Sequence, residues 1–440
     1  MSETQKALAN FISSGLPHYN ELWYALADVK LAALQTNTNL GYIDAERSHF
    51  IDLALDETIK GQHNNCHMID PLSGGAGTSL HMNINETIAS RAMALALEEN
   101  IKIEIHPLEH VNLHQSTNDV IPTAIHIAVY RQLHRLETEI NQTLLILQEK
   151  EQHFANILKL GRTQLMPAVP TTLGKTFSAY AEVLGRDRWR LAKCLERIRV
   201  VTLGGTAIGT GIAAPRSYIF EVIKTLRQNT GLPLSRAENL VDYTQNQDAL
   251  AEVFALVKVC SLNLEKIAND LRLMTLLGEI SLPEVQAGST IMPSKVNPVI
   301  PEMLIIIAKK VQGNELAAAS CIAHGELELN AFLPFIGYLL LESLDILSQG
   351  LERFRSRCLT GLTAKEDTCK LNLFQNPASA TLLIQKIGYS GAQIVADHMR
   401  NTHESLTSSV LALDVLSPDE LNVLLRPESL SQLGYDTSST

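Results

Sequence analysis

The segment that follows Pro122 and runs to Leu158 contains neither Gly nor Pro, and it constrains the fold more than any other part of the chain. Its apolar residues recur at steps of three, four or seven, which places them on one face of an α-helix. They are Leu133, Leu136, Ile140, Leu144, Leu147, Phe154 and Leu158. A helix of roughly 36 residues is about 55 Å long, longer than a small domain is wide. We therefore predict a long helix over 122–158 that packs along partners of similar length.

Further segments with the apolar stripes of helices supply those partners. They are 172–203, 245–277, 300–322 and 334–359. Aromatic residues make up only 5% of the chain. Aliphatic residues and alanine dominate instead, which favours helices over sheets. The sequence therefore predicts an all-α protein with a central bundle of five long helices.

The chain of 440 residues is long enough for two or three domains. We expect an N-terminal helical domain over 1–114, the central long-helix bundle over 115–363 and a small C-terminal helical domain over 364–440. The net charge of −11 argues against binding to duplex nucleic acid. Charges interrupt every apolar stretch before about 18 residues, so we expect no membrane span.

The ends of the chain and its cysteines bear on the compartment. No basic start followed by an apolar stretch is visible at the N-terminus, so we predict no secretory signal. The six cysteines form no C-x-x-C pair and are too sparse for a disulfide scaffold. We expect reduced thiols in a cytoplasmic protein.

Small and polar residues gather in the loops between the predicted helices. The loop Gly288–Pro298 contains Lys295, a charge that a carboxylate would seek, and Asn297, which offers both a donor and an acceptor. Taken alone, the loop favours interpretation as a surface loop with a solvated lysine. Gln115–Asp119 places five hydrogen-bonding side chains before an apolar helix, and it is either an N-cap cluster or a cradle for an anion.

The segments Gly77–Ser79 and Gly161–Gln164 repeat this theme, and we expect them to be loop-to-helix junctions that converge with the other two. Other groups of residues give weaker evidence of a functional site. His106, His110 and His114 are spaced by four, but Pro107 interrupts them and no carboxylate or cysteine ligand lies in register, so no metal site is predicted. The glycine-rich segment 204–211 lacks the lysine of a phosphate-binding loop and is interpreted as a tight turn.

The loop Gly288–Asn297 resembles the G-S-S-x-M-P-x-K-x-N signature of the aspartase/fumarase superfamily, with Thr290 at the second serine. These are all-α lyases that eliminate across a carbon–carbon bond to release fumarate. The segments 74–79, 115–119 and 161–165 occur in the family's order and at similar spacing, so the resemblance covers about residues 10–363. At 74–79 and 162–164 the chain is more similar to the aspartate ammonia-lyases than to the fumarases.

The resemblance implies a three-domain lyase whose long helices form the helical core of a homotetramer, with active sites shared between subunits. It implies a small dicarboxylate substrate, no cofactor, and the reversible conversion of L-aspartate to fumarate and ammonia. Ser289 is implied as the general base that removes the Cβ proton and leaves an aci-carboxylate intermediate. The residues implied in substrate binding are Thr78, Ser116, Thr117, Asn118, Thr163, Gln164, Lys295 and Asn297.

The chain also departs from the family's pattern. Lys6 stands nearest to an arginine that contacts a substrate carboxylate in aspartases, and it is a further candidate for that role. The segment between Leu271 and Pro283 is shorter than in aspartases. Two alternatives stay open: a lyase of the same superfamily that acts on another substituted succinate such as malate, and a catalytically silent structural relative. Gln164 argues against malate as the substrate.

Overall fold

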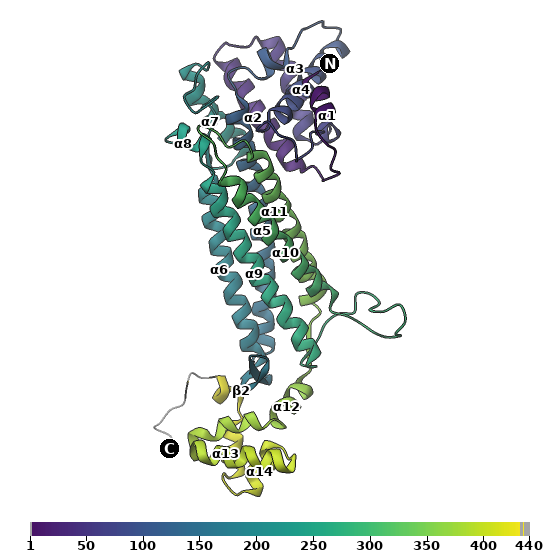
Figure 1. Cartoon of the computed structure of the whole chain (residues 1–440), viewed down its shortest axis with the longest axis vertical. Coiled ribbons are helices and arrows are strands. Elements are labelled where there is room, and N and C mark those ends of the chain that lie inside the picture. The colour runs from purple at the N-terminus through teal and green to yellow at the C-terminus, as the bar shows by residue number, and fades with distance from the viewer. Residues whose placement is uncertain (1, 432–433, 435–440) are drawn as a thin grey trace. The chain divides into compact units, whose positions relative to one another are not determined.

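The computed structural model describes residues 2–431 and 434, which fold almost entirely into α-helices (Figure 1). The strands of this part of the chain form three two-stranded pairs. They are β1 (Leu158–Thr163) with β2 (Met166–Thr172), β3 (Val200–Val201) with β4 (Ser235–Arg236), and β5 (Ile280–Ser281) with β6 (Thr363–Ala364). The expected all-α class is confirmed. No helix in the described part of the chain combines the length and the apolar character that a membrane span needs.

Five long helices run side by side in Figure 1, as the sequence predicts. They are α5 (Thr117–His153), α6 (Leu173–Ile198), α9 (Asp248–Leu276), α10 (Val299–Ile322) and α11 (Leu333–Phe354). Small residues let these helices approach closely. A Cβ atom on Gly337 of α11 would lie 2.8 Å from the side chain of Ile125 on α5, so only glycine fits there.

The bounds of α5 differ from the predicted 122–158. The helix begins at Thr117 because Ser116 caps it: Ser116 Oγ accepts the N–H of Asn118, and the carboxylate of Asp119 accepts the N–H of Ser116. It ends at His153, and the prediction of helix over 154–158 is wrong. Leu158 instead pairs with Thr172 in the β1–β2 hairpin and packs in a small core with Leu160 and Leu373.

The chain forms two compact units, each built from three stretches of sequence. The first comprises Met1–Thr138, Trp189–Ser261 and Ala308–Ser348, and the second comprises Glu139–Arg188, Leu262–Ile307 and Gln349–Thr440. Both units contain parts of the long helices. The division into three domains at 1–114, 115–363 and 364–440 stays a prediction.

In the first unit, several shorter helices and turns lie outside the long helices. These are α1 (Glu3–Asn10), α2 (Asn20–Asn39), α3 (Ala45–Ile59), α4 (Thr78–Glu98), α7 (Arg216–Thr230), α8 (Leu240–Gln245), and the short turns η1 (Asn64–Cys66) and η2 (Pro107–Val111). Helix α2 packs against both α3 and α7. It buries Trp23 and Leu26 completely, as expected for a central helix, but it also buries Asp28 and Lys30. Two charges in an apolar interior need specific partners.

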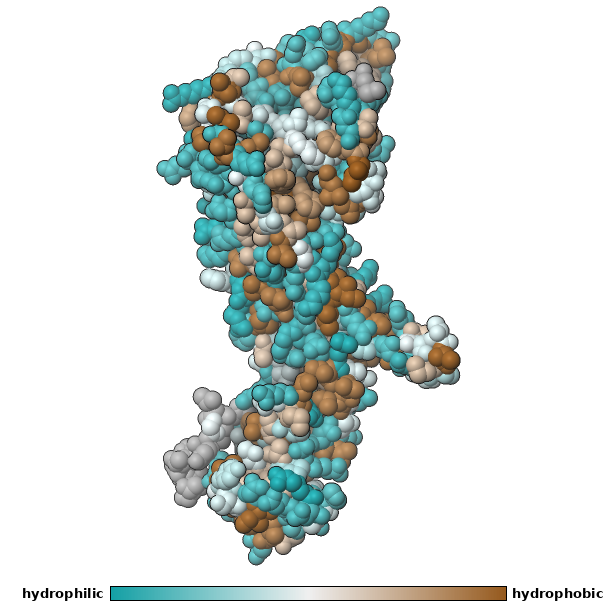
Figure 2. All heavy atoms as spheres, viewed as in Figure 1, coloured by the Kyte–Doolittle hydropathy of each residue, from teal (hydrophilic) through white to brown (hydrophobic). Residues whose placement is uncertain are grey.

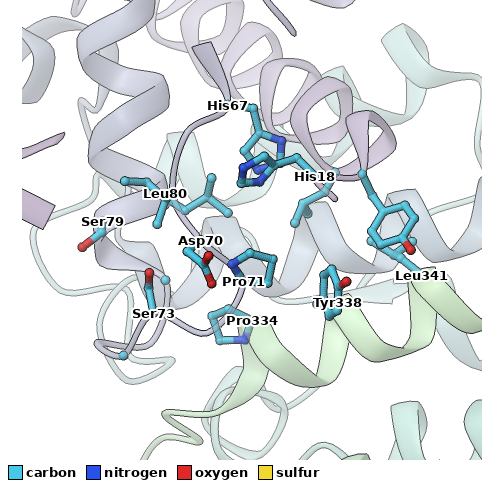
Figure 3. A pocket seen from close by; sticks show the side chains of 15 residues that line it. His18, His67, Asp70, Pro71, Ser73, Ser79, Leu80, Pro334, Tyr338 and Leu341 are labelled. Atoms are coloured by element: carbon cyan, nitrogen blue, oxygen red, sulfur yellow. The ribbon is translucent and has the colours of Figure 1, made fainter. Parts of the chain in front are cut away.

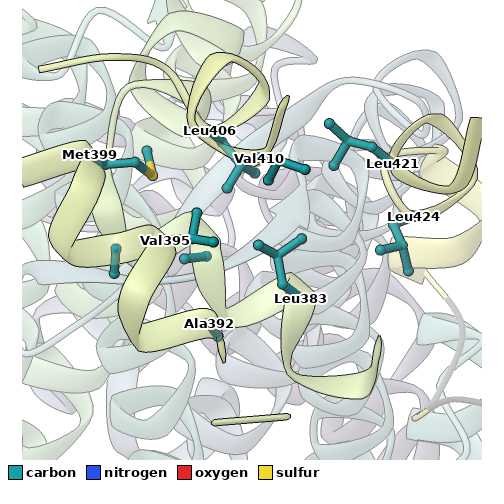
Figure 4. Packing of buried hydrophobic residues seen from close by; sticks show 10 residues of the cluster. Leu383, Ala392, Val395, Met399, Leu406, Val410, Leu421 and Leu424 are labelled. Carbon is teal, nitrogen blue, oxygen red and sulfur yellow. The ribbon is translucent and has the colours of Figure 1, made fainter. Parts of the chain in front are cut away.

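In the second unit, the C-terminal helices enclose a core of their own (Figure 4). After the π-helical turn η3 (Arg355–Leu359) come α12 (Glu366–Phe374), η4 (Pro377–Leu383), α13 (Ile384–Thr402), α14 (Leu406–Ala412), α15 (Pro418–Leu424) and α16 (Pro427–Ser431). Figure 4 shows Leu383 of η4, Val395 of α13, and Leu406 and Val410 of α14 pointing toward one another. These contacts stabilise short helices that would be only marginally stable in isolation.

Candidate active site

Helices α4 and α5 of the first unit begin side by side. Gly77, the N-cap of α4, has a φ of +89°, and a Cβ there would lie 3.1 Å from both Ile121 of α5 and Pro334 of α11. Both the left-handed backbone and the close approach require glycine at this position. The start of α4, which carries Thr78, therefore lies against the start of α5, which follows Ser116.

Two adjacent helix starts form a natural site for an anion, because free N–H groups and the positive ends of two helix dipoles face the same region. Thr78 is exposed, whereas Ser116, Thr117 and Asn118 are half-buried. The Asn118 side chain donates to the carbonyl of Ala207 at 2.8 Å, which leaves its own carbonyl oxygen available. Of the residues predicted from the sequence, these four are brought together, and the arrangement is suited to binding a carboxylate.

Asp119 is completely buried and fixes the start of α5. Its Oδ1 accepts the N–H of Ser116 at 2.9 Å, and its Oδ2 accepts the N–H groups of Gly204 and Thr206, both at 3.0 Å. Burial raises the pKa of this carboxyl group to about 6, although the three N–H donors oppose the shift. The glycine-rich segment 204–211 is thus a turn that the Asp119 side chain binds to the start of α5.

A chain of buried polar side chains extends from α2 to α5. The Lys30 Nζ lies 2.5 Å from His81 Nε2 on α4 and donates to Asn112 Oδ1 at 2.9 Å. His81 Nδ1 lies 2.9 Å from Thr117 Oγ1. Lys30 is 1% exposed and His81 2%, and burial lowers the pKa of both groups well below the usual values. The available signal was a lysine within the apolar stretch 22–34, which sequence reasoning passed over.

The signature loop lies in the second unit and is closed at its base. The N–H of Gly288 donates to the carbonyl of Lys295 at 2.8 Å, and Asn297 Nδ2 donates to the carbonyl of Gly288 at 2.9 Å. A Cβ on Gly288 would lie 2.6 Å from the Lys295 carbonyl oxygen, so this closure depends on glycine.

Inside that closure, Ser289 Oγ accepts two backbone N–H groups, from Ile291 at 3.1 Å and from Met292 at 2.9 Å. Two donors directed at one hydroxyl oxygen favour negative charge on that oxygen. Lys295 is exposed. The loop also exposes the apolar side chain of Ile291 by 85%, so its surface is partly apolar.

Thr163 is the last residue of β1, and Gln164 follows it in the turn of the β1–β2 hairpin, also in the second unit. The expectation that they form a loop-to-helix junction is wrong, because the strands that flank them pair with each other. Gln164 and Leu165 have φ values of 52° and 64°, a conformation that a two-residue hairpin turn usually gives to Asn or Gly. Each costs about 1 kcal/mol in a non-glycine residue. Both Thr163 and Gln164 have exposed side chains.

The predicted residues are thus divided between the units. Thr78 and the three residues at the start of α5 belong to the first unit, and Ser289, Lys295, Asn297, Thr163 and Gln164 belong to the second. Lys6 lies on α1 in the first unit, where its Nζ is 2.6 Å from Glu3 Oε1 and its side chain is exposed.

A pocket of about 510 Å³ in the first unit, part of it open to solvent, adjoins Thr78, since Gly77 and Ser79 line it (Figure 3). His18 and His67 line it next to each other, with ring centroids 4.6 Å apart and ring planes tilted by 42°. Burial lowers the pKa of His67 to about 3, so its ring is neutral. Across residues 2–431, no group of three or more His, Cys, Asp or Glu side chains is placed to hold a metal ion.

The comparisons with known proteins agree with these motifs. A family model described as "Lyase" matches residues 3–313. The chain is 40% identical over 438 residues to an aspartate ammonia-lyase of Bacillus subtilis, covering 98% of this chain and 92% of that protein. It is 36% identical over 436 residues to an aspartate ammonia-lyase of Helicobacter pylori, covering 97% of this chain and 93% of that protein.

Solved structures with the same fold include a fumarate lyase:delta crystallin from Brucella melitensis bound to cobalt. It has a TM-score of 0.92 and 36% identity, and the match covers 98% of this chain and 95% of that one. A class II fumarase from Schistosoma mansoni has a TM-score of 0.91 and 28% identity, with coverage of 98% and 95%. The fold is therefore shared by lyases with differently named activities.

Proposed function

The chain belongs to the aspartase/fumarase superfamily of lyases, and from that premise we propose that it converts L-aspartate reversibly to fumarate and ammonia. It is an enzyme of the carbon–nitrogen lyase type, like the aspartate ammonia-lyases that match it over nearly their whole length. The substrate is a small dicarboxylate, and the alternative substrate to be tested is malate.

Ser289 acts as the general base in this proposal. Its Oγ, as an alkoxide, takes the proton from Cβ of aspartate, and the C–H electron pair moves onto the adjacent carboxylate to form the aci-carboxylate. The observation that carries the assignment is the pair of N–H donors from Ile291 and Met292 on Ser289 Oγ, inside the loop that matches the family's signature. These donors stabilise the alkoxide, and exclusion of water around it would strengthen the effect.

The aci-carboxylate carries two negative charges on one group and needs donors placed in advance. We assign this role to Thr78, Ser116, Thr117, Thr163 and Gln164, with Asn118 among the substrate-binding residues. The adjacent starts of α4 and α5 support the assignment for the residues of the first unit. Lys295 and Asn297 hold the other carboxylate and the amine end. Collapse of the intermediate forms the double bond of fumarate, and the substrate's ammonium group leaves as neutral ammonia.

We also propose a homotetramer with active sites shared between subunits. The long helices leave large apolar side chains exposed in the single chain, and Figure 2 shows such patches among the hydrophilic surface over these helices. They include Trp189, Leu276, Ile306 and Leu316, each more than half exposed. Patches of this kind indicate a surface that another chain covers. The cytoplasmic location is proposed as well, and it is supported by the six cysteines, none of which forms a disulfide in the described part of the chain.

The assignment of Ser289 is tested by Ser289→Ala. We expect turnover of L-aspartate to fall by roughly three or more powers of ten, as for loss of a catalytic nucleophile or base, while the oligomer mass and thermal midpoint stay at the wild-type values. Ser294→Ala is the matched control, since it removes a hydroxyl from the same loop and should retain activity. Turnover by Ser289→Ala close to the wild-type rate would show that another group is the base.

A further inference from the structure

We propose that Lys30 and His81 form a positioning relay that holds the Thr117 hydroxyl as a hydrogen-bond donor toward the substrate carboxylate. The inference rests on the proposed function, in which Thr117 binds substrate. It concerns two residues that do not touch substrate themselves. The geometry that carries it is the continuous series of contacts from Lys30 Nζ through the two ring nitrogens of His81 to Thr117 Oγ1.

The direction of each hydrogen bond follows from what the groups can donate. The Asn112 Oδ1 only accepts, so Lys30 donates to it. In this proposal Lys30 is in its ammonium form, which has donors and no acceptor, so His81 Nε2 accepts from Lys30 at 2.5 Å. A neutral imidazole whose Nε2 accepts carries its proton on Nδ1. That N–H then donates to Thr117 Oγ1 at 2.9 Å.

The consequence is that the Thr117 oxygen is engaged as an acceptor while its own proton stays available. Other helical threonines of this chain use that proton locally: Thr58 and Thr123 each donate to the carbonyl four residues before them, at 2.8 and 2.7 Å. A hydroxyl satisfied in this way is not available to an anion. The contact with His81 directs the Thr117 proton away from the helix instead.

The surrounding charges keep the relay in this state. Burial favours the neutral form of His81, and the adjacent Lys30 charge favours it further. Burial also opposes the charge on Lys30, but the buried Asp119 carboxylate favours it. A dicarboxylate at the start of α5 would add negative charge near the lysine and strengthen the ammonium form.

The first test does not depend on activity. Nitrogen NMR spectra of protein labelled with ¹⁵N only in histidine report the tautomer of each ring, and the signal of His81 is the one that disappears in His81→Asn. We expect His81 to carry its proton on Nδ1, with Nε2 as a bare acceptor. A proton on Nε2, or on both nitrogens, would overturn the relay.

The second test is a double-mutant cycle on kcat/KM for L-aspartate. His81→Leu and Thr117→Val should each lower it by about 10- to 100-fold, as expected for loss of a hydrogen bond to a charged group. If His81 acts through Thr117, the double variant is no worse than Thr117→Val alone. His81→Asn retains a donor near the position of Nδ1 and should restore most of the loss.

Thr123→Val provides the matched control, because it removes a threonine hydroxyl from the same helix and should leave kcat/KM unchanged. Additive losses in the double variant would overturn the relay, since His81 would then act independently of Thr117. If the wild-type protein releases no fumarate from L-aspartate, the proposed function fails, and the NMR spectrum still decides the direction of the hydrogen bonds.

Discussion

At the scale of single residues, Asp119 connects segments that are far apart in the sequence. One carboxylate accepts three N–H groups, one from the residue that caps α5 and two from the glycine-rich turn. Because both segments border the candidate carboxylate site, Asp119 determines where the donors at the start of α5 lie. Its role is to position other groups, and a charge is needed there to satisfy all three donors.

We predict that Asp119→Asn lowers the free energy of unfolding by about 1–3 kcal/mol at pH 8, the usual cost of leaving buried donors without an acceptor. The amide nitrogen of asparagine cannot accept, so either the N–H of Ser116 or those of Gly204 and Thr206 lose their partner. Urea unfolding followed by circular dichroism measures the change. Stability equal to or above that of the wild type would show that removing the buried charge outweighs the lost hydrogen bonds.

The residues of the candidate site were predictable from sequence to different degrees. Ser289, Lys295 and Asn297 lie within one short motif, and the resemblance of that motif to the superfamily signature singles them out. Lys30 and His81 could not be found in this way, because they are 51 positions apart and only the packing of α2 against α4 brings them together. Local patterns describe local hydrogen bonds, and this pair depends on tertiary contacts.

At the scale of elements, periodicity located the long helices and misplaced some of their ends. The predicted 245–277 corresponds to α9 over Asp248–Leu276, and 300–322 to α10 over Val299–Ile322. The predicted 172–203 extends past the end of α6 at Ile198, since Val200 and Val201 pair with β4. This end is set by pairing with a distant strand, and the C-terminal end of α5 is set by the β1–β2 hairpin that follows it; an apolar stripe reveals neither.

His126 gives α5 a pH-dependent contact. Its ring is buried, and Nδ1 donates to the carbonyls of Ile198 and Val200 at 3.1 and 2.7 Å. Burial lowers its pKa from 6.5 to about 4. As the pH falls, the His126 ring is therefore protonated at a higher pH in the unfolded chain than in the folded protein. The stability that His126 contributes is fully present above pH 6.5 and is lost between about pH 6.5 and 4.

We predict that His126→Asn, which keeps an N–H for these carbonyls, removes this part of the pH dependence. Relative to the variant, the wild type should lose about 1.4 kcal/mol of unfolding free energy for each pH unit below 6.5. Urea unfolding of both proteins at several values between pH 7 and 5 measures the difference. Two parallel curves would mean that His126 is protonated equally in the folded and unfolded states.

At the scale of the whole molecule, the exposed apolar side chains of the long helices bear on the oligomeric state. Ile306 on α10 is 68% exposed in the single chain, and a charge at a buried subunit contact would be costly. We predict that the wild type has about four times the single-chain mass of 48.4 kDa and that Ile306→Glu shifts it toward smaller species.

Light scattering after size-exclusion chromatography measures both masses. Lys102→Glu, an exposed residue outside the long helices, is the control for a change of charge and should keep the wild-type mass. A monomeric wild type would contradict the tetramer and the shared active sites together. A tetrameric Ile306→Glu would place the subunit contacts on other faces of the helices.

The most direct test of the account is the ultraviolet absorbance of fumarate after the purified protein is mixed with L-aspartate, with L-malate in a parallel cuvette. We predict a rise with L-aspartate and none with L-malate, accompanied by release of ammonia. A rise with L-malate alone would contradict the assignment of aspartate as the substrate. No rise with either would contradict it as well and would direct the search to other substituted succinates.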